Sequence, residues 1–235
     1  MAIEKVPKAI ALIPDGNRRW ALGHKLSMLN GYSLGVKKFI DFSEWCKDYG
    51  VKNITVWAFS TENFKRPKRE IDALFNIYER AAKDPEMLQR LQRNQTKFNV
   101  IGDRSQLPKG LRSALERLER ETRNCTDRVI NMLIGYGGKE DILHAAKEYA
   151  RSVIKIGKVF TLTDSSFKKY LRSYAIPEID FVIRTSSEER ISGFLPWQIS
   201  YSELYFADKL WPDFSREDLK KALAEYGRRS RRFGT

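Results

Sequence analysis

The sequence predicts an α/β fold: one mostly parallel central sheet flanked by helices, formed by residues 1–235 as a single domain. Short apolar runs alternate along the chain with longer segments of helical period, which is the order expected of parallel βαβ units. The length allows a sizeable core, and no repeat, linker or low-complexity segment divides the chain. In such sheets, ligands bind beyond the carboxyl ends of the strands.

Six runs are predicted as strands because they are apolar or rich in β-branched and aromatic residues. In chain order they are "AIALI" (9–13), "NITVWAFS" (53–60), "KFNVIG" (97–102), "RVINMLIG" (128–135), "IDFVIRT" (179–185) and "ELYFA" (203–207). Helices are predicted where apolar residues recur every three or four positions. Their ranges are 33–48, one long amphipathic segment at 68–92, 109–123, 140–154, and a basic helix that closes the chain.

The formal net charge of +13 indicates a polyanionic partner, which could be nucleic acid, anionic lipid or a phosphorylated small molecule. A basic surface without a specific ligand is the alternative. No apolar run approaches the roughly 20 residues that span a membrane, and the first residues do not form a secretory signal. Cys46 and Cys125 fit no metal-binding spacing. We therefore expect a cytosolic protein, and leave open a peripheral contact with a membrane.

Three strand ends each deliver arginine together with serine, asparagine or acidic residues. They are "PDGNRR" after the first strand, "STENFKRP" after the second and "RTSSEERIS" after the fifth. Because carboxyl ends of parallel strands meet at one edge of a sheet, these loops can converge on one crevice. The sequence therefore favours a polyanion site there.

The first loop has the groups that hold phosphate. Gly16 allows close approach of the backbone, and Asn17 to Arg19 are predicted to begin a helix whose free N–H groups attract anions. Arg18 or Arg19 can add bidentate hydrogen bonds. Asp15 would repel a bare phosphate, so it indicates either Mg²⁺ bridging to the phosphate or a helix N-cap.

The fifth strand end repeats this pattern. Arg184 and Arg190, with the serines around Ser192, can grip a second phosphate group. Glu203 is a candidate second metal carboxylate or a surface charge. Neither nucleotide-binding glycine motif occurs, and the two histidines, His24 and His144, lie far apart. A histidine metal site or a Ser-His-Asp triad is therefore not expected.

Several segments together resemble the cis-prenyltransferase family, also called the undecaprenyl diphosphate synthase family. They are "IPDGNRRWA", "WAFSTENFKRP", "NMLIGYGGKEDI", "IDFVIRTSSEERISGFLPWQISYSELYFADKLWPDF" and the terminal "RRSRRFG", in family order from about 9 to 234. The resemblance implies elongation of an allylic prenyl diphosphate by isopentenyl diphosphate, with a new cis double bond. It also implies Mg²⁺ as the cofactor, and an apolar tunnel between sheet and helices for the growing chain, with Trp57, Phe59, Met132 and Ile134 on the sheet side.

The resemblance also implies roles for individual residues. Asp15 and Asn63 are the expected catalytic residues, and Asp15 and Glu203 the expected metal ligands. Expected substrate contacts are Gly16, Asn17, Arg18, Arg19, Trp20, Tyr32, Ser60, Phe64, Arg66, Arg184, Arg190, Ser192, Arg232 and Gly234. The last two belong to an Arg-x-Gly element that reaches the neighbouring subunit's site, so a homodimer is implied.

The sequence departs from the common bacterial pattern around both substrate sites. Met28 and Tyr32 stand where arginine and histidine are usual, and Phe64 replaces a tryptophan. Ser186-Ser187 replace a Gly-Gly pair, and Glu189 replaces a frequent histidine; Glu189 is either a further metal ligand or a surface charge. These changes leave the identity of the substrates open.

Four interpretations follow. The first is Mg²⁺-dependent cis elongation with isopentenyl diphosphate. The second is the same fold with another acceptor, either a second allylic diphosphate joined in an irregular linkage or an alcohol. The third is a non-catalytic partner subunit, against which the retained Asp15, Asn63, Arg184, Arg190 and Glu203 argue. The fourth is a basic RNA- or lipid-binding module, and since most aromatic residues lie in apolar runs we do not expect nucleic acid binding.

Overall fold

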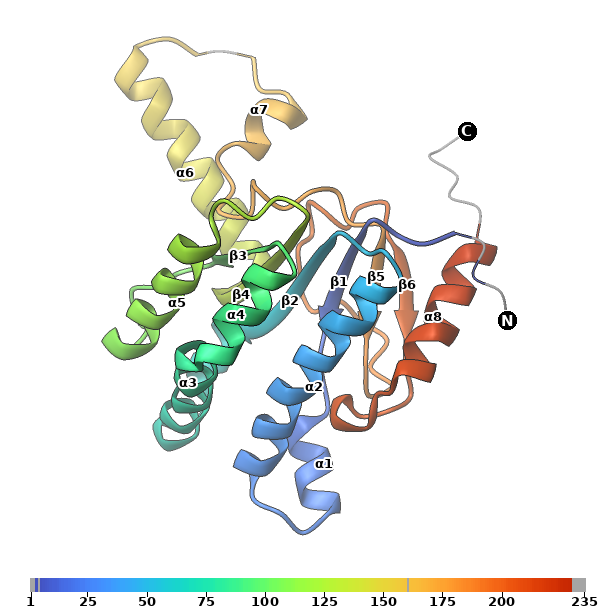
Figure 1. Ribbon diagram of the computed structural model, residues 1–235. Helices are drawn as coiled ribbons and strands as arrows, with labels where there is room; N and C mark the ends of the chain where they lie inside the picture. Colours follow the sequence, from blue (N-terminus) through green and yellow to red (C-terminus); the bar gives the residue numbers. More distant parts are fainter. Residues whose placement is uncertain (1–2, 4, 160, 230–235) are drawn as a thin grey trace.

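The computed structural model describes residues 3, 5–159 and 161–229, which form one six-stranded sheet in the order β3-β4-β2-β1-β5-β6 (Figure 1). Every neighbouring pair of strands is parallel. The predicted α/β fold with a parallel sheet is therefore confirmed. The strands are β1 (Ala9–Ile13), β2 (Asn53–Ser60), β3 (Thr96–Ile101), β4 (Arg128–Tyr136), β5 (Phe181–Arg184) and β6 (Glu203–Phe206).

The predicted helices occur in the expected order, with one segment divided and one short helix, α7 (Asp164–Lys168), that was not predicted. The α-helices are α1 (Asn17–Gly23), α2 (Met28–Asp48), α3 (Lys68–Lys83), α4 (Pro85–Arg93), α5 (Lys109–Thr122), α6 (Gly138–Ile156), α7 (Asp164–Lys168) and α8 (Arg216–Arg228). Short 3₁₀ turns η1 (Thr61–Lys65) and η2 (Trp211–Asp213) lie between them.

The single helix predicted over 68–92 is wrong, because the chain breaks between α3 and α4. Pro85 has no N–H to continue the helix and disfavours helical geometry at the residue before it. Asp84 accordingly has a ψ of 121°, and its carboxylate accepts a hydrogen bond from the N–H of Glu86 at 2.9 Å. The same proline thus ends α3 and begins α4.

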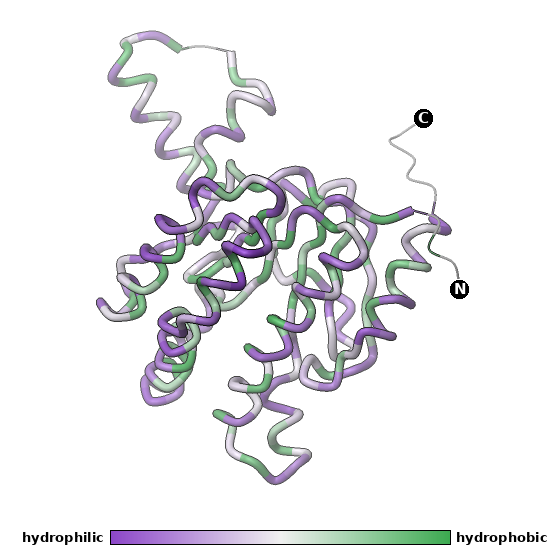
Figure 2. The backbone as a smooth tube through the Cα atoms, in the orientation of Figure 1, coloured by the Kyte–Doolittle hydropathy of each residue, from purple (hydrophilic) through white to green (hydrophobic). Residues whose placement is uncertain are grey.

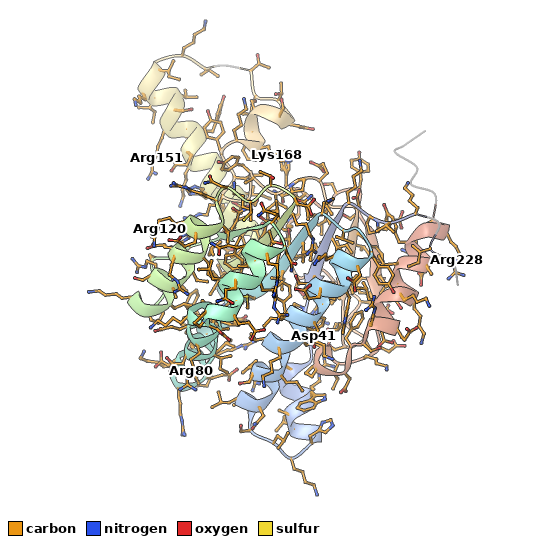
Figure 3. All side chains as sticks on the ribbon, viewed as in Figure 1. Asp41, Arg80, Arg120, Arg151, Lys168 and Arg228 are labelled. Carbon is orange, nitrogen blue, oxygen red and sulfur yellow. The ribbon has the colours of Figure 1, made fainter. Side chains whose placement is uncertain are left out.

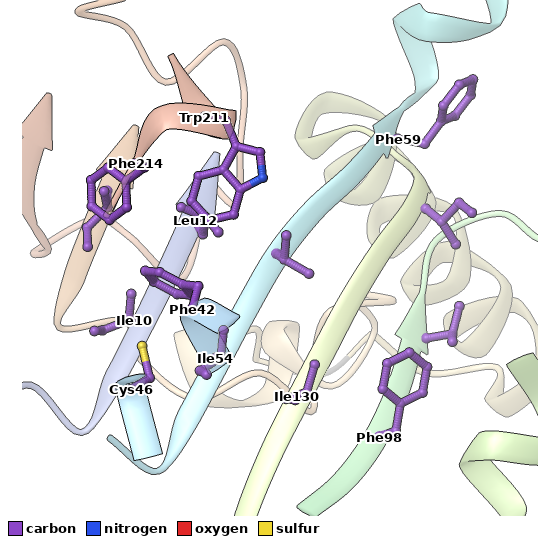
Figure 4. Packing of buried hydrophobic residues seen from close by; sticks show 14 of the residues in the cluster. Ile10, Leu12, Phe42, Cys46, Ile54, Phe59, Phe98, Ile130, Trp211 and Phe214 are labelled. Carbon is purple, nitrogen blue, oxygen red and sulfur yellow. The ribbon is translucent and has the colours of Figure 1, made fainter. Parts of the chain in front are cut away.

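The larger core lies on the face of the sheet covered by α2, α3, α4, α5 and α8. Ile10 and Leu12 of β1 point to this face, while Ala9, Ala11 and Ile13 point to the other, as the two-residue repeat of a strand requires. Figure 4 shows the centre of the core, where Phe42 lies close to Trp211 and Phe214. Burial of both faces explains why β1, at the centre of the sheet, is continuously apolar.

The second face is covered by the start of α6 and by the two segments that flank β5, 171–179 and 185–200. A buried polar network holds this segment: Asp141 accepts hydrogen bonds from the backbone N–H of Arg172 at 2.7 Å and from the Tyr136 hydroxyl at 3.2 Å. The Ser173 hydroxyl also donates a hydrogen bond to Asp141, and it accepts one from Gln198 Nε2 at 2.8 Å. The second of these segments runs directly from β5, so the bond from Gln198 to Ser173 also ties down the loop that follows that strand.

Polar side chains lie mostly on the outside of the helices. In Figure 2 the hydrophobic colour follows the strands, and the outer turns of the helices are hydrophilic. The exposed arginines labelled in Figure 3 come from different helices, among them Arg80 of α3, Arg120 of α5, Arg151 of α6 and Arg228 of α8. Among the described residues, no helix combines the length and apolar character that crossing a bilayer requires.

Two glycines of α2 allow α1 to lie against it at very short range. A Cβ at Gly31 would stand 2.3 Å from the backbone oxygen of Asn17, and a Cβ at Gly35 would stand 2.2 Å from the Asn17 Oδ1. The carbonyl of Gly35 also accepts the indole N–H of the buried Trp211 at 2.9 Å. These contacts place the turn after β1 against the body of the domain.

We therefore expect Gly35→Ala to lower the free energy of unfolding by about 1–3 kcal/mol, because the methyl group overpacks the contact with Asn17. Urea denaturation measures this change. Gly23→Ala is the matched control, since a Cβ there meets no atom within 4 Å and alanine favours helix. Equal stability of the two variants would contradict the close packing of α1 on α2.

Candidate active site

One cavity of about 820 Å³ begins at the carboxyl ends of the strands and extends between the sheet and helices α2 to α5. Its mouth brings together most of the residues predicted from the sequence. Those that line it are Asp15, Gly16, Asn17, Arg18, Arg19, Tyr32, Ser60, Asn63, Arg66, Arg184, Arg190 and Ser192. The three strand ends therefore converge, as the parallel sheet predicted.

An ion pair between Asp15 and Arg184 joins the first and third of these loops. Arg184 Nη2 lies 2.9 Å from Asp15 Oδ2, and the arginine side chain is only 5% exposed. Arg184 Nη1 donates to the Ser192 hydroxyl at 3.0 Å and also to the carbonyl of Arg190. The Thr185 hydroxyl donates to the Asp15 carbonyl at 2.7 Å. Asp15 is thus fixed in position through both its side chain and its backbone.

The turn after β1 requires glycine at Gly16. Its φ of +100° is rarely adopted by other residues, and a Cβ would lie 2.8 Å from Leu210 and 3.0 Å from Ser186. Gly16 is itself the N-cap of α1, and its N–H donates to Asp15 Oδ1 at 2.7 Å. Asp15 is therefore not the N-cap of α1, so the capping role considered from the sequence is excluded. Its carboxylate lies beside the mouth of the cavity.

The second loop is held by its own side chains. The Ser60 N–H donates to Asn63 Oδ1 at 3.0 Å, and the two residues form a reciprocal cap on η1. Both residues line the cavity, so this bond fixes their positions at its mouth.

Glu70, which the sequence reasoning missed, does not line the cavity but bonds to three residues that do. Its side chain is 5% exposed, accepts the Tyr32 hydroxyl at 2.7 Å and Arg66 Nη1 at 3.3 Å, and lies 3.7 Å from Arg18 Nη1. Burial, followed by the hydrogen bond to Glu70, raises the pKa of Tyr32, so its hydroxyl stays protonated as the donor. The Arg66–Glu70 spacing of four residues was the available signal.

In the third loop the carboxylate at the cavity is Glu188. It lies 3.0 Å from Arg19 and also pairs with Arg190. Glu189, the residue considered from the sequence, is exposed and does not line the cavity, which favours a surface charge. Ser186 and Ser187 have φ values of 78° and 56°, a left-handed geometry that explains why glycines suit these two positions.

The structure separates three predicted residues from the cavity. Trp20 donates its indole N–H to Asp213 at 2.7 Å, and Phe64 packs on Phe59 and Phe75. Glu203 begins β6, is level with Ile10 through β5, and pairs with Arg229 at 3.1 Å. It therefore lies toward the opposite edge of the sheet from Asp15 of the same chain. Arg232 and Gly234 lie outside the described residues.

The cavity itself agrees with the expected tunnel, with changes in its lining. Trp57 and Met132 line it on the sheet side, whereas Phe59 and Ile134 are fully packed in the core and do not. The helix side is formed by residues of α2, α3, α4 and α5, so the break at Pro85 adds a second helix to the wall.

The sequence comparison identifies the class. The family model described as putative undecaprenyl diphosphate synthase matches residues 13–234. The chain therefore belongs to the undecaprenyl diphosphate synthase family, that is, the cis-prenyltransferases, and the resemblance carried by the motifs is confirmed. It is a prenyl-transferring enzyme of this class.

Individual relatives agree along most of their length. An isoprenyl transferase from Thermus thermophilus is 42% identical, and the match covers 97% of this chain and 89% of that protein. A tritrans,polycis-undecaprenyl-diphosphate synthase (geranylgeranyl-diphosphate specific) from Pyrococcus horikoshii is 41% identical, covering 99% and 90%. The crystal structure of lavandulyl diphosphate synthase from Lavandula x intermedia, with dimethylallyl diphosphate, matches with a TM-score of 0.93 at 33% identity, covering 98% and 99%.

The buried carboxylate of Glu70 bonds to Tyr32 and pairs with two arginines. We therefore expect Glu70→Ala to lower the free energy of unfolding by about 1–3 kcal/mol. Urea denaturation is the measurement. Glu116→Ala removes an exposed carboxylate of α5 and should change stability by less than about 0.5 kcal/mol. If both variants lose the same amount, the bonds to Glu70 do not contribute to stability.

Proposed function

We propose that this chain extends an allylic prenyl diphosphate with isopentenyl diphosphate units, each adding a cis double bond. The observation that carries the proposal is the form of the cavity: an arginine-rich mouth at the strand ends leads into one continuous apolar space. The mouth suits two diphosphates, and the space suits a growing hydrocarbon chain.

The chemistry requires charge stabilisation and no protein nucleophile. The allylic C–O bond ionises, and the double bond of isopentenyl diphosphate attacks the allylic carbon to form the new carbon–carbon bond. The resulting cation then loses a proton, which the released diphosphate or water takes up, to form the new double bond. Diphosphate leaves with the negative charge. Arg18, Arg19 and Arg66 at the mouth are placed to stabilise that charge, while Arg184 and Arg190 serve the second diphosphate.

Asp15 is the residue that would hold Mg²⁺. Among the described residues no cluster of three histidine, cysteine or carboxylate groups forms a metal cage. Mg²⁺ commonly takes one or two carboxylates together with substrate phosphates, so a single Asp15 at the mouth fits a metal that binds with the diphosphate. When bound, the ion would neutralise negative charge on the leaving diphosphate.

We also propose a long trans allylic donor. Several relatives near 40% identity are named geranylgeranyl-diphosphate specific. A cavity of about 820 Å³ accommodates such a chain with room for extension. The second candidate is irregular coupling of two allylic diphosphates, which the similarity to lavandulyl diphosphate synthase and the altered Met28 and Tyr32 favour. The depth of the cavity, beyond the needs of a short donor, ranks elongation first.

A homodimer belongs to the same proposal. Leu143, Ile154 and Ile156 of α6 have exposed fractions of 59%, 81% and 63%, more than a solvated helix usually presents together. A second copy would cover them, and Arg232 and Gly234 would reach that copy's site. The product is apolar, so its release is expected to involve peripheral contact with a membrane, and a cytosolic location remains a prediction.

We expect Asp15→Asn to lower the rate of isopentenyl transfer by at least about 100-fold, because the carboxylate at the mouth is lost. Asparagine keeps an oxygen for Arg184. Asp15→Ala would leave that buried arginine unpaired, so a loss of activity could then come from a loss of stability. The assay follows labelled isopentenyl diphosphate with Mg²⁺ and a panel of allylic diphosphates, with products separated by length and linkage.

Asp208→Asn, an exposed substitution outside the cavity, is the control and should retain full activity. Unchanged transfer by Asp15→Asn would contradict the role of Asp15. Products formed without isopentenyl diphosphate would support irregular coupling. Folded wild-type protein that turns over no donor would support the partner-subunit interpretation.

A further inference from the structure

The cavity ends in charged and polar side chains at the end farthest from Asp15. Thr96, which lines this end, is level with Lys8 through the strand pairings, seven residues before Asp15. The five residues of β1, Ala9 to Ile13, lie between these two levels, which are therefore more than about 13 Å apart along the strand direction. The residues with charged or amide side chains that line this end are Glu44, Arg90 and Asn94.

These three residues and Lys47 form one bonded group, here called the distal cluster. Asn94 Nδ2 donates to Glu44 Oε1 at 3.0 Å, and Lys47 Nζ donates to Asn94 Oδ1 at 2.7 Å. Arg90 Nη1 lies 3.8 Å from Glu44 Oε1. The cluster therefore joins α2 to α4 and to the turn before β3.

The distal cluster is a wall between the cavity and solvent. The side chains of Glu44 and Arg90 are 31% and 29% exposed, yet both residues also line the cavity. Residues immediately inside the wall are apolar and buried, with Leu91, Phe98 and Leu118 each less than 10% exposed. The lining thus changes from hydrocarbon to charge at the end of the cavity.

This change in lining has a consequence for a hydrocarbon chain growing from the mouth. Each added unit that packs on Leu91, Phe98 and Leu118 is stabilised by burial. A unit that reaches Glu44 and Asn94 must displace hydrogen bonds to a carboxylate, and a prenyl chain offers no donor in exchange.

We infer that the distal cluster sets the upper length of the product chain. The inference rests on the proposed function and adds which residues decide product length. Extension stops when the far end of the chain meets the Glu44–Asn94 bond, so the limit comes from polar contacts as well as from cavity volume. A variant with an open cluster would let the chain leave between α2 and α4.

The test compares product lengths of the full chain with Glu44→Ala, Asn94→Leu and the wild type. Both variants should lengthen the longest product by at least one isoprene unit. Glu44→Gln, which keeps the size and the acceptor oxygen, should shift it less. Glu86→Gln is the matched control: it removes the other partner of Arg90, at 2.9 Å, but is 68% exposed and outside the cavity, and its products should match the wild type.

Binding measured without turnover separates this inference from the proposed function. For a series of prenyl monophosphates of increasing length, wild-type affinity should rise with length and then stop rising. In Glu44→Ala that break should move to longer chains. A moved break in a protein that performs no elongation would overturn the proposed function, while the distal cluster would still limit the length of the chain that the cavity binds. Identical product lengths and identical breaks in wild type, Glu44→Ala and Asn94→Leu would overturn the inference.

Discussion

The ion pair between Asp15 and Arg184 is the interaction on which the rest of the site depends. An arginine only 5% exposed is costly to keep charged unless it is paired with an opposite charge. Ser192 and the Arg190 carbonyl accept from this arginine, while Thr185 and the N–H of Trp211 bind the carbonyl of Asp15. The ion pair and the bonds to the Asp15 carbonyl thereby fix the turn after β1, the loop after β5 and the start of η2 relative to each other.

The fold places opposite chemistries at the two ends of this arrangement. The turn after β1 is compact because Gly16, Gly31 and Gly35 admit backbone and amide atoms where a methyl group would clash. That turn and the neighbouring strand ends carry the arginines, while the strands behind them are apolar on both faces. A cavity that starts at the strand ends and runs along the sheet therefore passes from charge to hydrocarbon, which is what a prenyl diphosphate presents.

Sequence reasoning reached the features that depend on local pattern. The strands were predictable because short apolar runs end in turn residues, and the convergence of their loops follows from a parallel sheet. It missed the break at Pro85, because the amphipathic period continues across the proline. It missed Glu70, whose partner Tyr32 comes from another helix. It placed Trp20, Phe64 and Glu203 near substrate, which their packing and the strand register do not support within one chain.

The most direct test of this account is a crystal structure of the protein with Mg²⁺ and a non-cleavable thiolo analogue of geranylgeranyl diphosphate. The account predicts the diphosphate at the Asp15–Arg19 turn and the hydrocarbon between the sheet and helices α2 to α4, directed toward Glu44. A diphosphate bound away from Asp15, or a hydrocarbon chain lying outside this cavity, would contradict it.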